Sequence, residues 1–236
     1  MHHHEVIILA GGLGTRLRSE IGAKPKCLAL VNGRPFMWYL VNYLKSQGSS
    51  GLIFSLGFGS EEVISLLPEI CGDLAYSYVV ENEPLGTGGA ISLALTKSIS
   101  DSVFVVNGDT MFPANLTTLM EFHKKTTAGV TVALKRMVNF DRYGAVDIDE
   151  SGVITRFNEK TFCTEGYING GIYVINKDWW NSLKLPEKFS VEKSVLEQFC
   201  TQGLIRGLPF EEYFIDIGIP EDYHRASVEF VHHGFF

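Results

Sequence analysis

Two spacings of apolar residues alternate along the chain. Short β-branched runs at 6–10, 52–56 and 76–80 have the length and composition of buried strands. Between them, residues 35–47 and 60–67 place apolar side chains every three or four positions, which is the period of an amphipathic helix. Strands that alternate with helices in this way predict βαβ units on a parallel sheet.

The second half adds hairpin-like segments to this pattern. Runs at 130–134, 145–148 and 153–157 are strand-like, and the last two flank the turn Asp149-Glu150-Ser151-Gly152. Antiparallel strands on a mainly parallel sheet are common in doubly wound folds. We therefore expect an α/β fold: a single Rossmann-like, doubly wound domain with a mostly parallel mixed sheet.

Composition narrows the class of partner. The chain has 236 residues and a formal charge of −7 without a block of Lys and Arg, so we expect no nucleic-acid partner. Its apolar runs are far shorter than the roughly 20 residues that cross a bilayer, so we expect no membrane partner. Four cysteines, dispersed without a C-x-x-C pair, favour a reducing cytoplasm over a disulfide framework or a zinc site. The expected partner is then a small molecule.

The first predicted strand runs into a glycine-rich loop, Gly11-Gly12-Leu13-Gly14-Thr15-Arg16-Leu17. Glycines at the carboxyl end of a strand allow backbone N–H groups to approach phosphate oxygens. Leu17 stands where a dinucleotide fingerprint needs a third glycine, which disfavours a nicotinamide-dependent dehydrogenase, and the Gly-Lys-Ser/Thr of a P-loop is absent. Nearby cations at Arg16, Lys24 and Lys26 are suited to binding a triphosphate. The alternative interpretation of the loop is an ordinary glycine-rich turn beside surface lysines.

These residues resemble the signature of the sugar nucleotidyltransferase family. The segment 9–17 matches its G-G-x-G-T-R-L element and Lys24-Pro25-Lys26 its P-K element, although Cys27 stands where the family usually has proline. The resemblance implies catalytic roles for Arg16 and Lys26 at the reacting phosphates. It also implies a set of nucleotide-binding residues: Leu9, Ala10, Gly11, Gly12, Gly14, Thr15, Arg16 and Lys26.

A second glycine-rich turn precedes a predicted helix, at Glu83-Pro84-Leu85-Gly86-Thr87-Gly88-Gly89-Ala90. Its glycines would let the backbone lie against a base and ribose, and the alternative is an ordinary tight turn. The resemblance favours the nucleobase pocket, because the family carries a P-L-G-T-x-G-A element there. It implies further nucleotide-binding residues in this turn and after the strand-like run at 103–106, namely Glu83, Leu85, Gly86, Thr87, Asn107 and Gly108.

Two carboxylates follow apolar runs. Asp109 comes after the run at 103–106, and Asp216 comes directly after Phe214-Ile215. An acid at the end of a central strand can hold Mg²⁺ against phosphates, although a single Asp there could equally cap a helix or turn. Mg²⁺ commonly takes one or two carboxylates and keeps phosphates and water as its other ligands. The family pairs a G-D strand end with a D-x-G element, which implies Asp109 and Asp216 as metal ligands and Asp109 as a catalytic residue.

Three short segments lie between these acids in the sequence: Tyr143-Gly144, Glu159-Lys160 and Asn169-Gly170. Individually, each fits a surface ion pair or a turn. The resemblance places them around the sugar phosphate, with Glu159 on sugar hydroxyls, Lys160 on the phosphate and Asn169 as donor and acceptor. The expected sugar-phosphate-binding residues are therefore Tyr143, Gly144, Glu159, Lys160, Asn169 and Gly170.

The similarity runs from about Val6 to Tyr223 and is greatest to the branch that acts on D-glycero-α-D-manno-heptose 1-phosphate with GTP. It implies a reaction of these two substrates, with Mg²⁺, that releases pyrophosphate. The alternatives are a mannose 1-phosphate guanylyltransferase, another hexose 1-phosphate nucleotidyltransferase and, in a different class, a catalytically inactive nucleotide-sugar-binding regulatory module. A decayed module should have lost part of the charged set, yet all of it is present: Arg16, Lys26, Asp109 and Asp216.

We expect residues 1–4 to be the remnant of an expression tag and residues 5–236 to form one domain. Within it, the nucleotide-binding part would span about 5–110 and the sugar-phosphate-binding part about 111–236. The expected location is cytoplasmic. Apolar residues near the C-terminus predict a docked tail, a subunit contact in a homo-oligomer, or an ordinary helix that covers the core: Phe230, Val231, Phe235 and Phe236.

Overall fold

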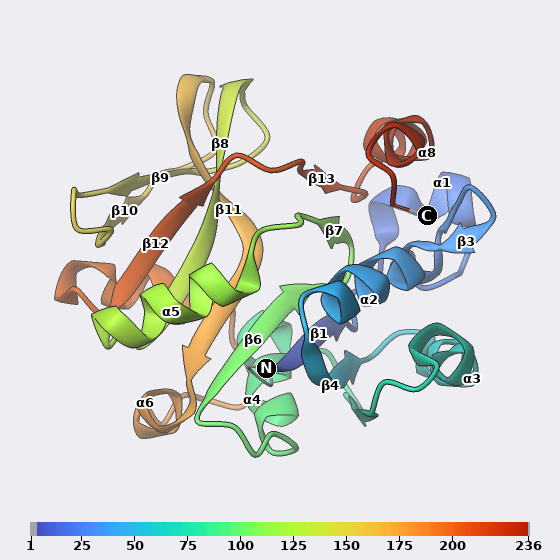
Figure 1. The fold of residues 1–236 in the computed structure, drawn as a ribbon, viewed down its shortest axis with the longest axis horizontal. Coiled ribbons are helices and arrows are strands. Elements are labelled where there is room, and N and C mark those ends of the chain that lie inside the picture. The colour runs from blue at the N-terminus through green and yellow to red at the C-terminus, as the bar shows by residue number, and fades with distance from the viewer. Residues whose placement is uncertain (1–3, 236) are drawn as a thin grey trace.

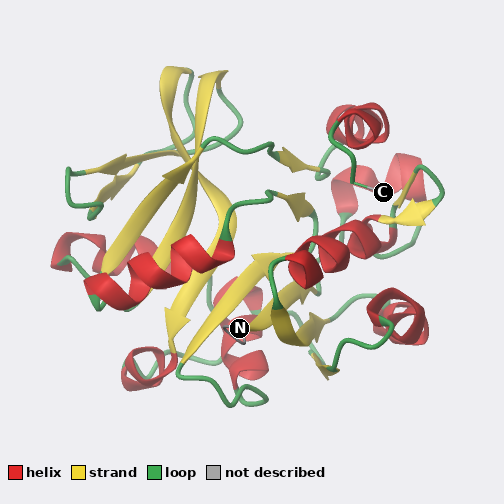
Figure 2. Cartoon of the chain, in the orientation of Figure 1, coloured by secondary structure: helices red, strands yellow, loops and turns green. Residues whose placement is uncertain are grey.

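Helices cover both faces of a central sheet in the computed structural model, which describes residues 4–235 (Figures 1 and 2). The strands are β1 (His4–Ala10), β2 (Leu30–Val31), β3 (Arg34–Pro35), β4 (Ser49–Leu56), β5 (Tyr76–Val80), β6 (Ser102–Asn107), β7 (Thr110–Met111), β8 (Val130–Phe140), β9 (Ala145–Ile148), β10 (Ile154–Phe157), β11 (Cys163–Asn176), β12 (Ile205–Phe210) and β13 (Ile215–Asp216). The helices are α1 (Arg18–Ile21), α2 (Phe36–Ser46), α3 (Ser60–Cys71), α4 (Gly86–Leu95), α5 (Leu116–Thr126), α6 (Lys177–Ser182), α7 (Glu197–Phe199) and α8 (Pro220–His232). Short 3₁₀ segments lie at η1 (Thr15–Leu17), η2 (Lys26–Leu28) and η4 (Cys200–Gln202), and a π-helical turn lies at η3 (Glu192–Leu196).

The first half of the chain builds a parallel sheet in the order β5-β4-β1-β6. Ile7 of β1 is aligned with Ile53 of β4 on one side and with Val105 of β6 on the other. Helices α2, α3 and α4 connect these strands in turn. The βαβ pattern predicted from the sequence is therefore confirmed.

The second half makes the sheet mixed, as predicted, because β11 joins β6 in the antiparallel direction. β8 pairs antiparallel with β11, β12 pairs parallel with β8, and β9 and β10 form the expected hairpin. The strand predicted at 130–134 continues to Phe140. β11 bends where its register shifts between Asn169 and Tyr173, and Gly171 takes a φ of +74° at this bulge.

Alternate residues of each central strand enter separate apolar cores on the two faces of the sheet. Val6 and Ile8 pack with apolar side chains of α2, α3, α5 and α8, whereas Ile7 packs with those of α4 and α6. Both faces are covered, which explains why these strands read as continuous apolar runs rather than as alternating ones.

The two ends of the described chain pack onto this body. Phe230 is fully buried and the Phe235 ring lies 5.1 Å from it, so these two residues pack onto the core, whereas Val231 is exposed. His4 is the first residue of β1 and packs edge-on against Phe104, with ring centroids 5.2 Å apart. The rest of the predicted tag remnant, Met1 to His3, and Phe236 lie outside the described residues. No helix within residues 4–235 combines the length and the apolar character needed to cross a membrane.

Candidate active site

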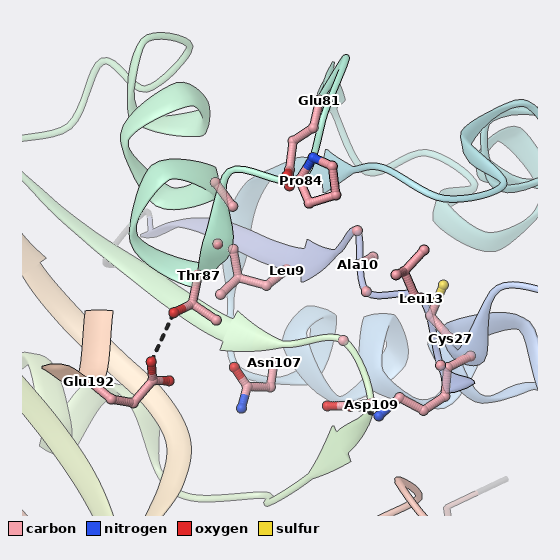
Figure 3. A pocket seen from close by; sticks show the side chains of 17 residues that line it. Leu9, Ala10, Leu13, Cys27, Glu81, Pro84, Thr87, Asn107, Asp109 and Glu192 are labelled. Atoms are coloured by element: carbon pink, nitrogen blue, oxygen red, sulfur yellow. Dashed lines mark hydrogen bonds and ion pairs between the residues drawn. The ribbon is translucent and has the colours of Figure 1, made fainter. Parts of the chain in front are cut away.

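The parallel strands end at one edge of the sheet, where a cavity of about 440 Å³ opens (Figure 3). Backbone hydrogen bonds bring the residues after these strands together. Gly108 N–H donates to the Leu9 carbonyl at 2.9 Å, and Glu81 N–H donates to the Leu56 carbonyl at 2.8 Å. Open α/β sheets bind ligands outside the carboxyl ends of their strands, so the cavity lies where a ligand is expected.

The glycine-rich loop forms one wall of this cavity. A Cβ added to Gly11 would lie 2.8 Å from Glu81 Oε1, so a larger residue there would require this carboxylate to shift. A Cβ added to Gly12 would meet no atom within 4 Å, because the residue faces open space. Gly14 takes a φ of +58° and caps the N-terminus of η1. The backbone at Gly12 is therefore accessible to a ligand, as a phosphate-binding loop requires.

Lys26 and Asp109 form an ion pair on the cavity wall. Their side chains are only 15% and 28% exposed. The neighbouring Cys27 is buried, and burial raises the pKa of its thiol to about 12, so this side chain is a neutral lining group at physiological pH. The pair thus places one cation and one anion next to the glycine-rich loop.

Asp216 is brought to Asp109 by a short strand pair. β7 and β13 are antiparallel with Asp216 opposite Thr110, and the Ile217 N–H donates to the Asp109 carbonyl at 3.0 Å. Burial and the negative charge of Asp109 raise the pKa of Asp216. The Lys26 ammonium opposes this shift. A buried carboxylate beside a second negative charge is an environment in which a bound cation would be stabilised.

Arg16 reaches the same region from the opposite end of the loop. A Cβ added to Gly218 would lie 3.5 Å from Arg16 Nη2 and 2.8 Å from Asp216 Oδ1. The guanidinium and the carboxylate therefore flank one glycine. Arg16 is exposed and is not among the residues that line the cavity, and the same is true of Thr15.

The donor set fits Mg²⁺ in one specific way. Within residues 4–235, no group of three or more His, Cys, Asp and Glu side chains is arranged to hold a metal ion. Asp109 and Asp216 are instead a pair, and Mg²⁺ is usually held by one or two carboxylates together with substrate phosphates and water. The two aspartates thus fit this ion when a phosphate ligand is present.

The second glycine-rich turn packs against a distant segment of the chain. The Gly88 N–H donates to the Phe189 carbonyl at 3.0 Å, and the Phe189 N–H donates to the Leu85 carbonyl at 2.9 Å. A Cβ on Gly86 would lie 2.5 Å from the Phe189 carbonyl oxygen, and one on Gly88 would overlap the Phe189 ring. These glycines are therefore needed for packing within the protein as well as for any close approach of a ligand.

The residues predicted around the sugar phosphate do not line this cavity. The Tyr143 ring packs edge-on against Phe214, with centroids 5.7 Å apart, and burial with the charge of Asp216 raises the pKa of Tyr143 to about 12. Asn169 Nδ2 donates to the Tyr173 hydroxyl at 2.8 Å. The remaining predicted residues lie at three places: Gly144 next to Asn158, Gly170 against the Phe112 ring, and Glu159 and Lys160 exposed between β10 and β11.

Most of the predicted nucleotide-binding residues line the cavity together. They are Leu9, Ala10, Gly11, Gly12, Gly14, Lys26, Gly86, Thr87, Asn107 and Gly108, and the predicted metal ligand Asp109 lies among them. Leu85 is buried beneath the turn, and Glu83 is exposed and outside the lining. Their roles, like those of the other site residues, stay predictions.

The sequence analysis missed two acidic residues of the cavity, Glu81 and Glu192. Glu81 directly follows β5, so its position at a strand end was a signal that could have found it. Glu192 carried no local signal, because it is joined to Thr87 across 105 positions of sequence.

Comparisons with known proteins agree with this geometry. A family model described as nucleotidyl transferase matches residues 5–232. D-glycero-α-D-manno-heptose 1-phosphate guanylyltransferases of Aneurinibacillus thermoaerophilus and Campylobacter jejuni are each 42% identical to the chain, over 97% and 95% of it and 99% of each relative. A mannose-1-phosphate guanylyltransferase of Mycobacterium tuberculosis is 32% identical over 98% of this chain and 65% of that protein.

Solved structures give the same result for the fold. HddC from Yersinia pseudotuberculosis, in a crystal structure complexed with GMP-PN, superimposes with a TM-score of 0.86 at 35% identity, covering 96% of this chain and 99% of that one. The match extends across both halves of the sheet and therefore includes the cavity. By sequence and by structure, this chain belongs to the nucleotidyl transferase family.

Proposed function

We propose that this chain joins GTP to D-glycero-α-D-manno-heptose 1-phosphate, giving GDP-heptose and pyrophosphate. One observation carries the proposal: relatives named for this activity match the chain nearly end to end at 42% identity. The mannose-1-phosphate guanylyltransferase of Mycobacterium tuberculosis is less similar, at 32%, and extends well beyond the matched region. It therefore supports a related but secondary candidate.

The cavity supports guanine as the base through Glu81. Glu81 Oε2 accepts a hydrogen bond from the Leu85 N–H at 2.8 Å, which fixes the carboxylate at the cavity wall. The Watson–Crick edge of guanine presents two adjacent N–H donors, at N1 and N2, and a carboxylate accepts both. Adenine offers a ring acceptor at N1, which a carboxylate repels. Glu81 thus favours GTP over ATP.

In the proposed mechanism, a phosphate oxygen of the sugar 1-phosphate attacks the α-phosphorus of GTP. A new O–P bond forms as the bond between the α-phosphorus and the bridging oxygen breaks, and pyrophosphate leaves with the bonding electron pair. No general base is required, because a phosphate monoester is largely ionised near neutral pH. The protein then acts by positioning the two substrates, which can supply on the order of 7 to 11 kcal/mol in well-aligned cases.

The charged residues have separate tasks in this mechanism. The backbone of Gly11 and Gly12 holds the triphosphate, and Lys26 and Arg16 offset the charge that develops on pyrophosphate. Lys160 would anchor the sugar phosphate from its exposed segment. Asp109 and Asp216 would hold Mg²⁺, which when bound neutralises phosphate charge. The proposed location is the cytoplasm, where GTP is available as a substrate.

The proposal is tested by pyrophosphate release from the full chain with Mg²⁺. GTP, ATP, CTP, UTP and dTTP are each combined with heptose 1-phosphate, mannose 1-phosphate and glucose 1-phosphate. We expect the highest kcat/KM with GTP and heptose 1-phosphate. A higher value with mannose 1-phosphate would favour the second candidate, and no release from folded protein would favour the regulatory module. Sedimentation of the same sample determines whether the chain forms a homo-oligomer.

A further inference from the structure

Glu192 is an acidic residue of the cavity that the proposed mechanism does not use. It is the first residue of the π-helical turn η3, and its side chain lines the cavity. π-helical turns are rare and occur frequently at functional sites, because the irregular turn aims a side chain that a regular helix would direct elsewhere. A buried or lining carboxylate also needs partners to stabilise its charge.

Two hydroxyl groups anchor one oxygen of this carboxylate. Thr87 Oγ1 donates to Glu192 Oε2 at 2.9 Å, and Ser190 Oγ donates to the same oxygen at 2.5 Å. The Val191 N–H in turn donates to Thr87 Oγ1 at 2.9 Å. No hydrogen bond from residues 4–235 reaches Glu192 Oε1. Because a carboxylate oxygen accepts up to two hydrogen bonds, Oε1 is available to a ligand.

The chemistry of the carboxylate limits which ligand group it can accept. A carboxylate repels phosphate, so Glu192 does not serve the triphosphate or the phosphate of the sugar. It accepts hydrogen bonds from N–H and O–H donors. Figure 3 shows Glu192 and Glu81 on different walls of the cavity, and the proposed function assigns Glu81 to the base. Hydroxyl groups are the donors that remain.

The neighbours of Glu192 on the cavity wall connect it to the β11 bulge. Asn107 lies between Glu192 and Asp109 in Figure 3. A Cβ on Gly171 would lie 2.7 Å from Asn107 Nδ2, so the β11 bulge packs behind this part of the wall. The bulge carries Asn169, whose Oδ1 accepts from the Gly171 N–H at 2.9 Å. Glu192 therefore shares its end of the cavity with the segment expected to bind the sugar.

We infer that Glu192 is a specificity-determining residue that accepts hydrogen bonds from hydroxyl groups of the sugar 1-phosphate. The inference rests on the proposed function. Thr87 and Ser190 position the carboxylate, and the free oxygen selects sugars that present a hydroxyl at that point. The ribose of the nucleotide also carries hydroxyl groups, and the experiment distinguishes binding of the ribose from binding of the sugar 1-phosphate.

Glu192→Gln is the informative variant, because the amide keeps an oxygen for the two hydroxyl groups while the charge is lost. Steady-state pyrophosphate release gives KM for the sugar 1-phosphate and KM for GTP separately. Loss of a hydrogen bond to a charged group predicts a KM for the sugar 1-phosphate raised about tenfold or more. KM for GTP should change by less than about twofold, because the inference gives Glu192 no contact with the nucleotide.

Glu197→Gln is the matched control, since it removes the same charge from an exposed residue of the following helical segment, α7. It should leave both KM values unchanged, and equal melting temperatures would show that both variants fold. An unchanged KM for the sugar 1-phosphate in Glu192→Gln, or a rise confined to GTP, would overturn the inference. Turnover of the wild-type chain, measured in the same series, tests the proposed function independently of the KM values of the variants.

Discussion

Replacement of Glu81 by glutamine should weaken the preference for GTP, because it changes which groups face the base. The Leu85 N–H donates to one oxygen of the Glu81 side chain at 2.8 Å. In the variant, the amide oxygen would retain this bond, since the amide NH₂ cannot accept it. The NH₂ group would then take the position of Oε1, next to Gly11, and turn two donors toward the donor edge of guanine.

The expected magnitude follows from the bonds that are lost. A hydrogen bond to a charged group contributes about 1.5 to 3 kcal/mol, and a buried donor left without an acceptor adds a further cost. A net loss of about 2 kcal/mol corresponds to a decrease of about 30-fold in kcat/KM for GTP at 25 °C. ATP should lose less or gain, because an amide can donate to adenine N1 and accept from its amino group.

The assay is pyrophosphate release with GTP and with ATP at a saturating concentration of the sugar 1-phosphate. Glu83→Gln is run beside it, because it removes the same charge two residues further along, from an exposed side chain outside the cavity lining. A GTP-to-ATP ratio that stays unchanged in Glu81→Gln would refute the proposed contact with the base. A lower GTP-to-ATP ratio in Glu83→Gln alone would indicate that Glu83, the residue named in the sequence analysis, contacts the base.

Three further predictions test the phosphate loop, the ion pair and the core. Gly12→Ala should leave the melting temperature unchanged, because the added Cβ meets no protein atom within 4 Å, but it should raise KM for GTP if triphosphate occupies that space. Lys26→Ala should lower kcat by on the order of 10²- to 10³-fold with an unchanged circular dichroism spectrum, and near-normal turnover would remove Lys26 from catalysis. Burial lowers the pKa of His123 to about 4 from 6.5, so the unfolded state binds the proton first as pH falls. The free energy of unfolding should therefore have its highest value above about pH 6.5 and should be lower by about 3 kcal/mol at pH 4. Urea titrations at the two pH values measure this difference, which should be smaller in His123→Gln.

The sequence predicted those parts of the fold that depend on neighbours along the chain. β5 and β9 have the predicted bounds, and β1 and β4 contain the predicted runs. β1 and β4 were readable because strands buried on both faces are continuously apolar, whereas β5, which is partly exposed, was readable from its β-branched and aromatic residues. The turn between β9 and β10 was equally readable, since Gly152, with a φ of +78°, closes it in a conformation that favours glycine.

Glu83, which the motif indicated, and Glu81, which lines the cavity, show where local pattern stops being informative. The motif identified the turn, but the end of β5 decides which glutamate reaches the cavity, and that end is set by pairing with β4. Glu81 N–H donates to the Leu56 carbonyl, so the ladder continues to this residue and holds it at the sheet edge. A side chain two residues beyond the last strand bond is free to turn outward, as Glu83 does.

By itself, the sequence predicted the alternation of strands and helices in the first half of the chain, the hairpin of β9 and β10, the glycine-rich loop after β1 and the two aspartates that follow apolar runs, because apolar period, glycine spacing and strand-end position are local properties. Only the tertiary structure decided which residues share the cavity. Asp216 meets Asp109 through the β7–β13 pair, and Glu192 meets Thr87 across 105 positions. Such contacts depend on strand register and on how one packed face lies against another, and no short segment of the chain encodes either.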